Sequence, residues 1–330
     1  MQQQTEPLLA ALDAVAVGAA HLFAPGGACR ACGAGVAGTG GGVLADRPDG
    51  TVVRHGVAVA KAHAPDTETA PHRVRLAVAA HPELAGILLP PLPLPAAPPA
   101  LAGRPVSVWP HGSPVDPDAP DAAPWEDAAA LLARLHRVPP AGLPAPLPPM
   151  RGPAKAARAV TRLRAAAGRH PAARPVLAAW AGLPAWARGE GPDPGAALCH
   201  GDFHLGQLVR HPAGTGPWLL IDVDDLGTGD PAWDLARPAA WYAAGLLAPE
   251  AWERFLGAYR AAGGTAVPAE GDPWPRLDVP ARALTVQTAA LAVAKSAAAR
   301  RELDDSERRV VDACARIATL PGQLGVPDPS

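Results

Sequence analysis

The chain has 330 residues, 48% of them hydrophobic, and a formal net charge of −2 at pH 7. This apolar content is sufficient for a sizeable core, while the balanced charge, with no Lys- or Arg-rich run, argues against nucleic acid as a partner. The 34 glycines and 42 prolines fall just below the level at which such a composition indicates disorder, so we expect a folded protein with stiff loops.

Residues 7–23 predict an amphipathic or partly buried helix, because Asp13 interrupts an apolar run that is too short to span a bilayer. We therefore expect no membrane partner. Four cysteines in a chain of this length, without a basic-then-apolar leader, favour a reducing compartment, and we expect a cytoplasmic protein. Cys29 and Cys32 have the spacing of zinc and redox sites, but no second pair accompanies them. We interpret them as small apolar residues, with a metal or redox role as the alternative.

Short β-prone runs and one helical pattern follow. Residues 43–63 contain two turn signals that separate three short runs, which predicts an antiparallel meander whose last strand presents Lys61. The Gly-rich residues 33–42 are expected to be a flexible loop before the first strand. Further along, the pattern predicts a helix within 66–82 and strands at 86–92 and 104–112, separated by a Pro-rich connector. These elements form a small lobe of five strands and one helix.

Residues 113–123 are a polar, Pro-broken linker, after which the apolar spacing becomes helical. A short β insert is expected at 207–211 and 217–223. Helices are predicted within residues 124–138, 154–168, 175–189, 249–263 and 279–303. The fold class is therefore α+β, with a small antiparallel N-terminal lobe over residues 1–112 and a larger, mainly helical C-terminal lobe over residues 113–330.

Residues 198–238 gather two histidines and six carboxylates, in "LCHGDFHLGQLV" and "WLLIDVDDLGTGDPAWDLARP". Asp202 lies in the loop that leads into one strand, and Asp222 ends the strand expected to pair with it. The Gln207 amide lies between them in sequence. Two carboxylates and an amide oxygen form a hard-oxygen cluster, which suits Mg²⁺.

The segments "HGDFHLGQ" and "LLIDVDDLGTGDPAWDLA" resemble the two acidic motifs of the aminoglycoside phosphotransferase and choline kinase-like family. The meander with "VAVAK", the strand "VSVWPHG" and the helix ending "LARLHRVP" occur in the family's order, and the HLGQ wording also resembles maltokinase-like members. The resemblance implies a protein-kinase-like fold of two lobes with the site between them. It also implies transfer of the γ-phosphate of ATP, with Mg²⁺, to a hydroxyl of a small molecule such as an aminoglycoside, sugar, amino alcohol or amino acid derivative.

The same resemblance assigns roles to particular residues. Asp202 orients and deprotonates the acceptor hydroxyl, Gln207 and Asp222 hold Mg²⁺, and Lys61 contacts the α- and β-phosphates of the nucleotide. Lys61 is one of only three lysines among 29 basic residues, which favours a selected role for its compact charge. Trp109, near the hinge, is expected to bind the nucleotide together with Lys61. The expected supporting residues are His200, Asp224 and Asp234 around the acidic motifs.

The chain departs from the family pattern at three places. Gln207 replaces the usual Asn and is one methylene longer. No GxGxxG phosphate loop lies between the first two strands, where the sequence is "RPDG". The helix after Lys61 should offer a glutamate to pair with it, but Glu68 comes early and Glu83 late.

Other interpretations remain open from sequence. The spacing of His200, Asp202 and His204 is compatible with a transition-metal hydrolase, and the absent phosphate loop with a nucleotide-binding pseudokinase or regulatory module. Asp230 and Asp234 are expected to cap a helix and fix the loop, and His200 to fix its backbone. Asp224 and Asp225 are equally compatible with ligand binding and with solvated turn positions. Nothing in the sequence predicts an oligomeric state.

Overall fold

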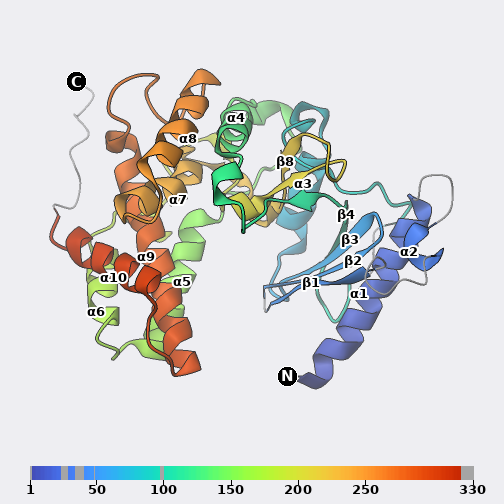
Figure 1. Cartoon of the computed structure of the whole chain (residues 1–330), viewed down its shortest axis with the longest axis horizontal. Coiled ribbons are helices and arrows are strands. Elements are labelled where there is room, and N and C mark those ends of the chain that lie inside the picture. Colours follow the sequence, from blue (N-terminus) through green and yellow to red (C-terminus); the bar gives the residue numbers. More distant parts are fainter. Residues whose placement is uncertain (1, 24–28, 34–40, 48, 97–99, 321–330) are drawn as a thin grey trace. The chain divides into compact units, whose positions relative to one another are not determined.

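The computed structural model describes residues 2–23, 29–33, 41–47, 49–96 and 100–320 (Figure 1). Their contacts divide the chain into two compact units. The first comprises the residues up to Val115, with Pro144–Pro146 and Leu208–Ile221; the second comprises the remainder. An antiparallel sheet dominates the first unit and helices dominate the second, so the predicted α+β class is confirmed. The expected lobe boundary after residue 112 remains a prediction. Residues Leu208–Ile221, which contain the predicted β insert, belong to the first unit by their contacts.

The sheet of the first unit has the order β1-β2-β3-β4, and every neighbouring pair is antiparallel. Its strands are β1 (Gly41–Arg47), β2 (Gly50–His55), β3 (Ala58–His63) and β4 (Val106–Pro110). The meander predicted over residues 43–63 is therefore present, with Lys61 on its third strand. Of the Gly-rich stretch expected to be a flexible loop, residues 34–40 lie outside the described residues.

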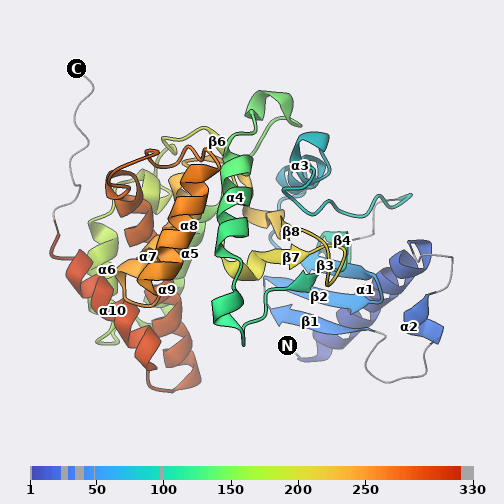
Figure 2. The same cartoon turned by 45° about the horizontal axis from the view of Figure 1, so that its top comes forward.

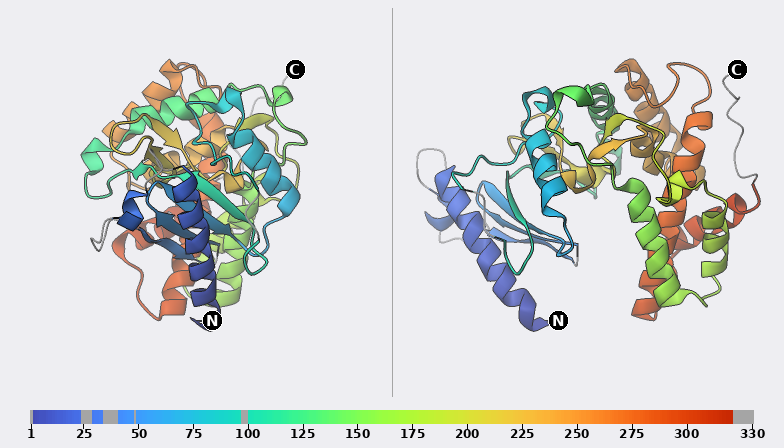
Figure 3. Two further views of the ribbon diagram at one scale, coloured as in Figure 1. Left: turned by 90° about the vertical axis from the view of Figure 1, so that its right-hand side faces the viewer. Right: turned by 180° about the vertical axis from the view of Figure 1, so that it is seen from behind.

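Helix α1 (Gln2–Leu22) covers one face of this sheet, as the right panel of Figure 3 shows. Ala58, Ala60 and Ala62 alternate along β3 and are fully buried, because successive strand residues point to opposite faces. Leu12 of α1 is likewise fully buried in the same core cluster. The small alanines allow the helix to approach the sheet closely. A short helix, α2 (Arg30–Gly33), follows α1.

The strand predicted at residues 86–92 is wrong. Within this run, which follows α3 (Thr69–Ala79), the chain forms only an isolated bridge from Leu88 to Leu220. Pro90 and Pro91 have no N–H group to donate, so the run cannot continue as a regular strand. The insert itself is confirmed as a small antiparallel sheet, whose strands in the order of pairing are β5 (Ser113–Pro114), β7 (Leu208–Arg210) and β8 (Trp218–Leu220).

The second unit packs helices around one long helix, α9 (Trp274–Ala299), which contacts α5 and α7 (Figure 2). Half of its residues are buried, and they lie between Leu277 and Ser296. Helix α10 (Asp305–Ile317) was not predicted; it begins with a capping box between Asp304 and Glu307. The other helices of this unit are α4 (Trp125–His136), α5 (Gly152–Ala167), α6 (Ala173–Ala181), α7 (Ala232–Ala243), α8 (Pro249–Ala261) and α10 (Asp305–Ile317).

No helix among the described residues is both long enough and apolar enough to cross a membrane.

Candidate active site

A two-stranded ladder in the second unit brings the two acidic motifs together. Strand β6 (Ala197–Cys199) pairs antiparallel with β9 (Gly227–Gly229), so the loop that follows β6 lies beside the segment that precedes β9. Gly201 in this loop has φ of +82°, and a Cβ atom there would lie 2.3 Å from the Asp225 carbonyl oxygen. Only glycine satisfies both the left-handed backbone and this close approach. The HGD loop (His200–Asp202) is therefore held tightly against Asp225.

The Asp202 carboxylate is bound on both oxygens by cations. Lys155 Nζ lies 2.6 Å from Oδ2, and Arg237 Nη2 lies 2.7 Å from Oδ1. Arg237 also donates from Nε to the Phe203 carbonyl, so the guanidinium holds both the side chain and the backbone of the loop. Burial opposes ionisation of Asp202, but Lys155 and Arg237 outweigh it and keep its pKa below the ordinary value. Asp202 is consequently an ionised, oriented carboxylate.

Lys155 bridges two carboxylates, since its Nζ also lies 2.7 Å from Oδ2 of Asp225. Burial lowers the pKa of Lys155, whereas the two carboxylates raise it by more, and the net shift is upward. The pKa of Asp225 is raised, first because the residue is buried and then because Asp202 and Asp222 repel its charge, although Lys155 opposes the shift. Arg151 Nε is 3.6 Å from Asp225. Cations on and beside α5 thus form a compact network of alternating charge with the carboxylates Asp202 and Asp225.

Gln207 and Asp222 lie next to each other, as the metal-site interpretation requires. Gln207 ends the short helix η6 (Leu205–Gln207), and its Nε2 lies 3.4 Å from Oδ2 of Asp222. Asp222 has φ of +62° and ψ of +71°. A non-glycine residue in the left-handed region costs about 1 kcal/mol or more, and such positions cluster at functional sites. Turning the Gln207 amide by half a rotation would place its oxygen beside the carboxylate.

Asp234 fixes the backbone of the HGD loop. Its carboxylate accepts the N–H groups of His200 at 2.6 Å and Gly201 at 2.8 Å. It also contacts His136 Nε2 at 3.0 Å. All three contacts are buried, so the carboxylate is removed from water but well paired. These are the contacts of a loop-fixing residue rather than of a ligand.

In the hydrogen bond between His136 and Asp234, the histidine is the donor. Tyr259 Oη accepts the N–H of Ala266 at 2.9 Å and lies 2.7 Å from His136 Nδ1. The Asp234 carboxylate can only accept, so Nε2 of His136 carries the proton donated to it; in this neutral tautomer Nδ1 is an acceptor, and the Tyr259 hydroxyl donates to it. Burial raises the pKa of Tyr259, so this donor stays protonated.

The histidines of the loop do not form a transition-metal site in the described part of the chain. No group of three or more His, Cys, Asp and Glu side chains whose ligand atoms lie within 4.8 Å of one another includes Asp202 or His204 among those residues. His204 Nδ1 accepts the Gly206 N–H, and burial, followed by the nearby Arg237, lowers the pKa of His204 to about 4. His200 is fully buried. The hydrolase interpretation therefore lacks the additional ligands that it requires.

The remaining predicted residues lie as follows. In the first unit, Lys61 on β3 stands opposite Val52 and Ser107 in the register. Trp109 on β4 is buried and donates from Nε1 to Ser107 Oγ at 2.8 Å. In the second unit, Asp224 lies in the short helix η7 (Val223–Asp225), and Asp222 is the N-cap of that helix.

The expected glutamate partner of Lys61 is not supplied by α3, whose sequence TAPHRVRLAVA contains no acidic residue. Glu68 is the N-cap of α3, and Glu83 lies beyond it in the short helix η2 (Pro82–Leu84).

Sequence reasoning missed Lys155 and Arg237, the two cations on Asp202. Lys155 is 47 positions from Asp202, on α5, and no motif joins them. One signal was present in the composition. The scarcity of lysine that favours a role for Lys61 applies equally to Lys155.

Comparison with known proteins accounts for this arrangement. Residues 50–277, more than half of the chain, match the model of the family described as "Phosphotransferase enzyme family". The chain belongs to this family. Membership identifies it as a phosphotransferase that acts on small molecules, as the acidic motifs predicted. No match was found among curated proteins.

Solved structures of small-molecule kinases share the fold of this phosphotransferase. Choline kinase from Cryptosporidium parvum Iowa II is 10% identical, with a TM-score of 0.55 over 92% of this chain and 95% of that one. Spectinomycin phosphotransferase, solved with ADP and spectinomycin, is 12% identical, with a TM-score of 0.52 over 86% and 90%. A choline/ethanolamine kinase family protein from Mesorhizobium loti is 18% identical, with a TM-score of 0.51 over the same shares. The protein-kinase-like fold class is thereby confirmed.

Proposed function

We propose that this phosphotransferase moves the γ-phosphate of ATP, with Mg²⁺, to a hydroxyl group of a small molecule. The observation that carries the proposal is the Asp202 carboxylate, ionised and held by Lys155 and Arg237 on a loop that Asp234 fixes. Phosphoryl transfer requires positioning and charge stabilisation more than covalent chemistry, and this loop supplies both.

Asp202 is assigned to the acceptor hydroxyl. Each carboxylate oxygen has two lone-pair positions, so an oxygen already bound by a cation can still accept a proton from the hydroxyl. The lowered pKa makes Asp202 a weak base at the start of the reaction. Its first effect is therefore to orient the hydroxyl toward the phosphate, and the proton is transferred as charge develops on the attacking oxygen.

Gln207 and Asp222 are assigned to Mg²⁺. Their side chains form an adjacent pair that offers only amide and carboxylate oxygens, and Mg²⁺ prefers such ligands over nitrogen or sulfur. Neighbouring Asp225 adds negative charge. When bound, the ion would supply positive charge that offsets the negative charge developing on the phosphate.

Lys61 and Trp109 are assigned to the nucleotide. Lys61 would contact the α- and β-phosphates with a compact positive charge, and Trp109 would border the base. The solved spectinomycin phosphotransferase is a complex with ADP, which favours an adenine nucleotide for the shared fold. The acceptor class is an aminoglycoside, a sugar or an amino alcohol.

A screen of hydroxyl-bearing metabolites and antibiotics for ADP release tests the proposal. The full chain is incubated with ATP and Mg²⁺ and one compound at a time, and hits are checked for the phosphorylated product by mass spectrometry. We expect turnover that stops when EDTA removes the divalent ion and resumes when Mg²⁺ is restored. Binding of Mg·ATP without transfer to any acceptor would instead support a pseudokinase, and the absence of nucleotide binding would contradict the proposal.

A further inference from the structure

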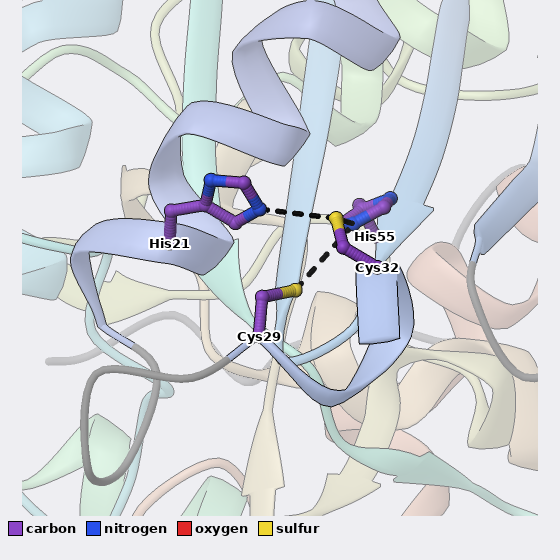
Figure 4. Close-up of side chains that lie close together, drawn as sticks. All are labelled: His21, Cys29, Cys32 and His55. Carbon is purple, nitrogen blue, oxygen red and sulfur yellow. Dashed lines mark hydrogen bonds between the residues drawn. The ribbon is translucent and has the colours of Figure 1, made fainter. Parts of the chain in front are cut away.

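A second cluster of ligand side chains lies in the first unit, away in sequence from the acidic motifs. His21, Cys29, Cys32 and His55 place one ligand atom each within 4.8 Å of one another (Figure 4). His21 Nε2 lies 3.1 Å from Cys32 Sγ. His55 Nε2 lies 3.3 Å from Cys32 Sγ and 3.6 Å from Cys29 Sγ. All four side chains thus converge on one point.

These distances match the edges of a zinc tetrahedron. Zinc–sulfur bonds of about 2.3 Å and zinc–nitrogen bonds of about 2.05 Å place ligand sulfur and nitrogen atoms about 3.6 Å apart at the tetrahedral angle. The same geometry gives about 3.8 Å between two sulfurs and about 3.4 Å between two nitrogens. The observed sulfur–nitrogen separations of 3.1 to 3.6 Å need only small rotations of the side chains to meet these values.

The ligands come from three parts of the chain that the fold brings together. His21 lies in the last turn of α1, and His55 is the last residue of β2. Cys29 directly precedes α2, and Cys32 lies within it. Gly56, with φ of +53°, turns the chain immediately after His55. A Cβ atom at position 56 would lie 3.8 Å from Cys29 Sγ and 3.4 Å from Ala31 Cβ. The hairpin turn therefore lies directly against the cysteine segment.

We propose that His21, Cys29, Cys32 and His55 bind one structural zinc ion through both sulfurs and both Nε2 atoms. Two cysteine sulfurs and two histidine nitrogens fill all four positions of a tetrahedral Cys₂His₂ site, which leaves no open position for a substrate. Binding converts two thiols to thiolates and releases two protons, so the occupied site has no net charge. The ion would tie the C-terminal end of α1 to the β2–β3 hairpin.

A disulfide between Cys29 and Cys32 is the competing chemistry for a pair at this spacing. Both thiols are free in the structure, and each has a histidine nitrogen within 3.6 Å. A disulfide would give these imidazoles no role, whereas zinc uses all four groups. The geometry therefore favours metal over redox chemistry.

Metal analysis of the full chain tests the site. The protein is expressed without a polyhistidine tag, purified under argon, and its zinc measured by inductively coupled plasma mass spectrometry. We expect about one zinc per chain, and almost none in the double variant Cys29→Ser/Cys32→Ser. The matched control is Cys199→Ala/Cys314→Ala, which removes two buried cysteines outside the cluster and should keep the full zinc content.

Cobalt provides a readout that does not depend on the double variant folding. Titration of metal-free wild-type chain with Co²⁺ should produce the intense visible bands of a tetrahedral site and a near-ultraviolet thiolate charge-transfer band. The single variant His21→Asn, at an exposed position, should bind zinc about tenfold or more weakly in competition with a chromogenic chelator.

Three results would overturn the proposal: wild-type protein without zinc and without a tetrahedral cobalt spectrum, zinc retained in the double serine variant, or a Cys29–Cys32 disulfide in the argon-purified chain. Because the readout is metal content, these outcomes are independent of whether the chain transfers phosphate.

Discussion

Lys155 and Asp202 form an ion pair in which Nζ lies 2.6 Å from Oδ2, between helix α5 and the HGD loop. Because Lys155 also reaches Asp225, the two carboxylates share this one cation, in addition to Arg237 on Asp202 and Arg151 near Asp225. The loop that carries the proposed catalytic residue is thus balanced by a side chain that no local motif specifies.

Replacement of Lys155 by Met should destabilise the protein. The Asp202 and Asp225 side chains are only 15% and 11% exposed, so they would face each other without this cation. We expect the free energy of unfolding to fall by about 2 kcal/mol or more, which is less than for a fully buried pair because Lys155 keeps 27% exposure. Urea denaturation measures the loss. Adding Asp225→Asn to Lys155→Met should recover part of it, and a single variant as stable as wild type would contradict the pairing.

Asp202→Asn should separate binding from transfer. The amide keeps the size of the carboxylate but cannot accept the hydroxyl proton, so we expect kcat to fall by about 10² to 10⁴. Affinity for Mg·ATP should change little, because Gln207, Asp222 and Lys61 remain. Calorimetry for the nucleotide and a coupled ADP assay distinguish the two quantities. An unchanged rate would remove Asp202 from the reaction.

Gln207 and Asp222 can be tested as metal ligands by matched substitutions. Gln207→Asn offers the same kind of ligand atom and should keep measurable activity, whereas Gln207→Leu should lose most of it. Asp222→Asn should abolish turnover and raise the Mg²⁺ concentration needed for ATP binding. Circular dichroism serves as the folding control. If Gln207→Leu retains as much activity as Gln207→Asn, the amide is not a ligand.

Asp234→Asn should loosen the HGD loop. The Asn amide has one oxygen and one NH₂ group, and the NH₂ group cannot accept a hydrogen bond. In one orientation it would face the Gly201 N–H, and in the other it would face the His200 N–H and His136 Nε2. We expect a loss of about 2 kcal/mol in unfolding free energy together with a lower kcat. Asp230→Asn is the matched control, since Asp230 accepts the Ala232 N–H through one oxygen that an amide can replace. Equal effects of the two substitutions would argue against a special role for Asp234.

His111 predicts a pH dependence of stability. Burial, followed by the nearby Arg54 and His211, lowers the pKa of His111 from 6.5 to about 4. Between these values the unfolded chain binds a proton that the folded chain does not, so the free energy of unfolding rises with pH across this window. The contribution reaches at most about 1.4 kcal/mol per pH unit. Urea denaturation at several pH values should give a shallower slope for His111→Gln than for wild type; identical slopes would contradict the assignment.

The acidic motifs could be read from sequence because their chemistry is local. Asp202 and Gln207 are five positions apart in one loop, and Asp222 ends the strand that was expected to pair with the chain after Gln207. The meander was also predictable, since turn residues separate runs with period-two alternation. Each of these signals lies within about twenty residues, which is the range over which spacing limits geometry.

The contacts that could not be predicted join segments distant in sequence. Lys155 reaches Asp202, 47 positions away, only because the chain just before α5 bridges to β9 through Pro149 and Thr228. His55 reaches Cys29, 26 positions away, only because the hairpin turn lies against the cysteine segment. The strand expected at residues 86–92 failed for a different reason. Its apolar composition suited a strand, but Pro90 and Pro91 remove the donors that a ladder requires.

Strand β1 forms an edge of the four-stranded sheet and is largely exposed, with Val43 and Leu44 more than half accessible to solvent. Such an edge can recruit a strand from another molecule and start aggregation. The register shift between Val43 and Ala45 interrupts the regular spacing of backbone donors and acceptors at this point. The irregularity therefore makes this edge a poorer template for a second molecule, and we expect a change that straightens β1 to favour insoluble protein even if the enzyme folded correctly.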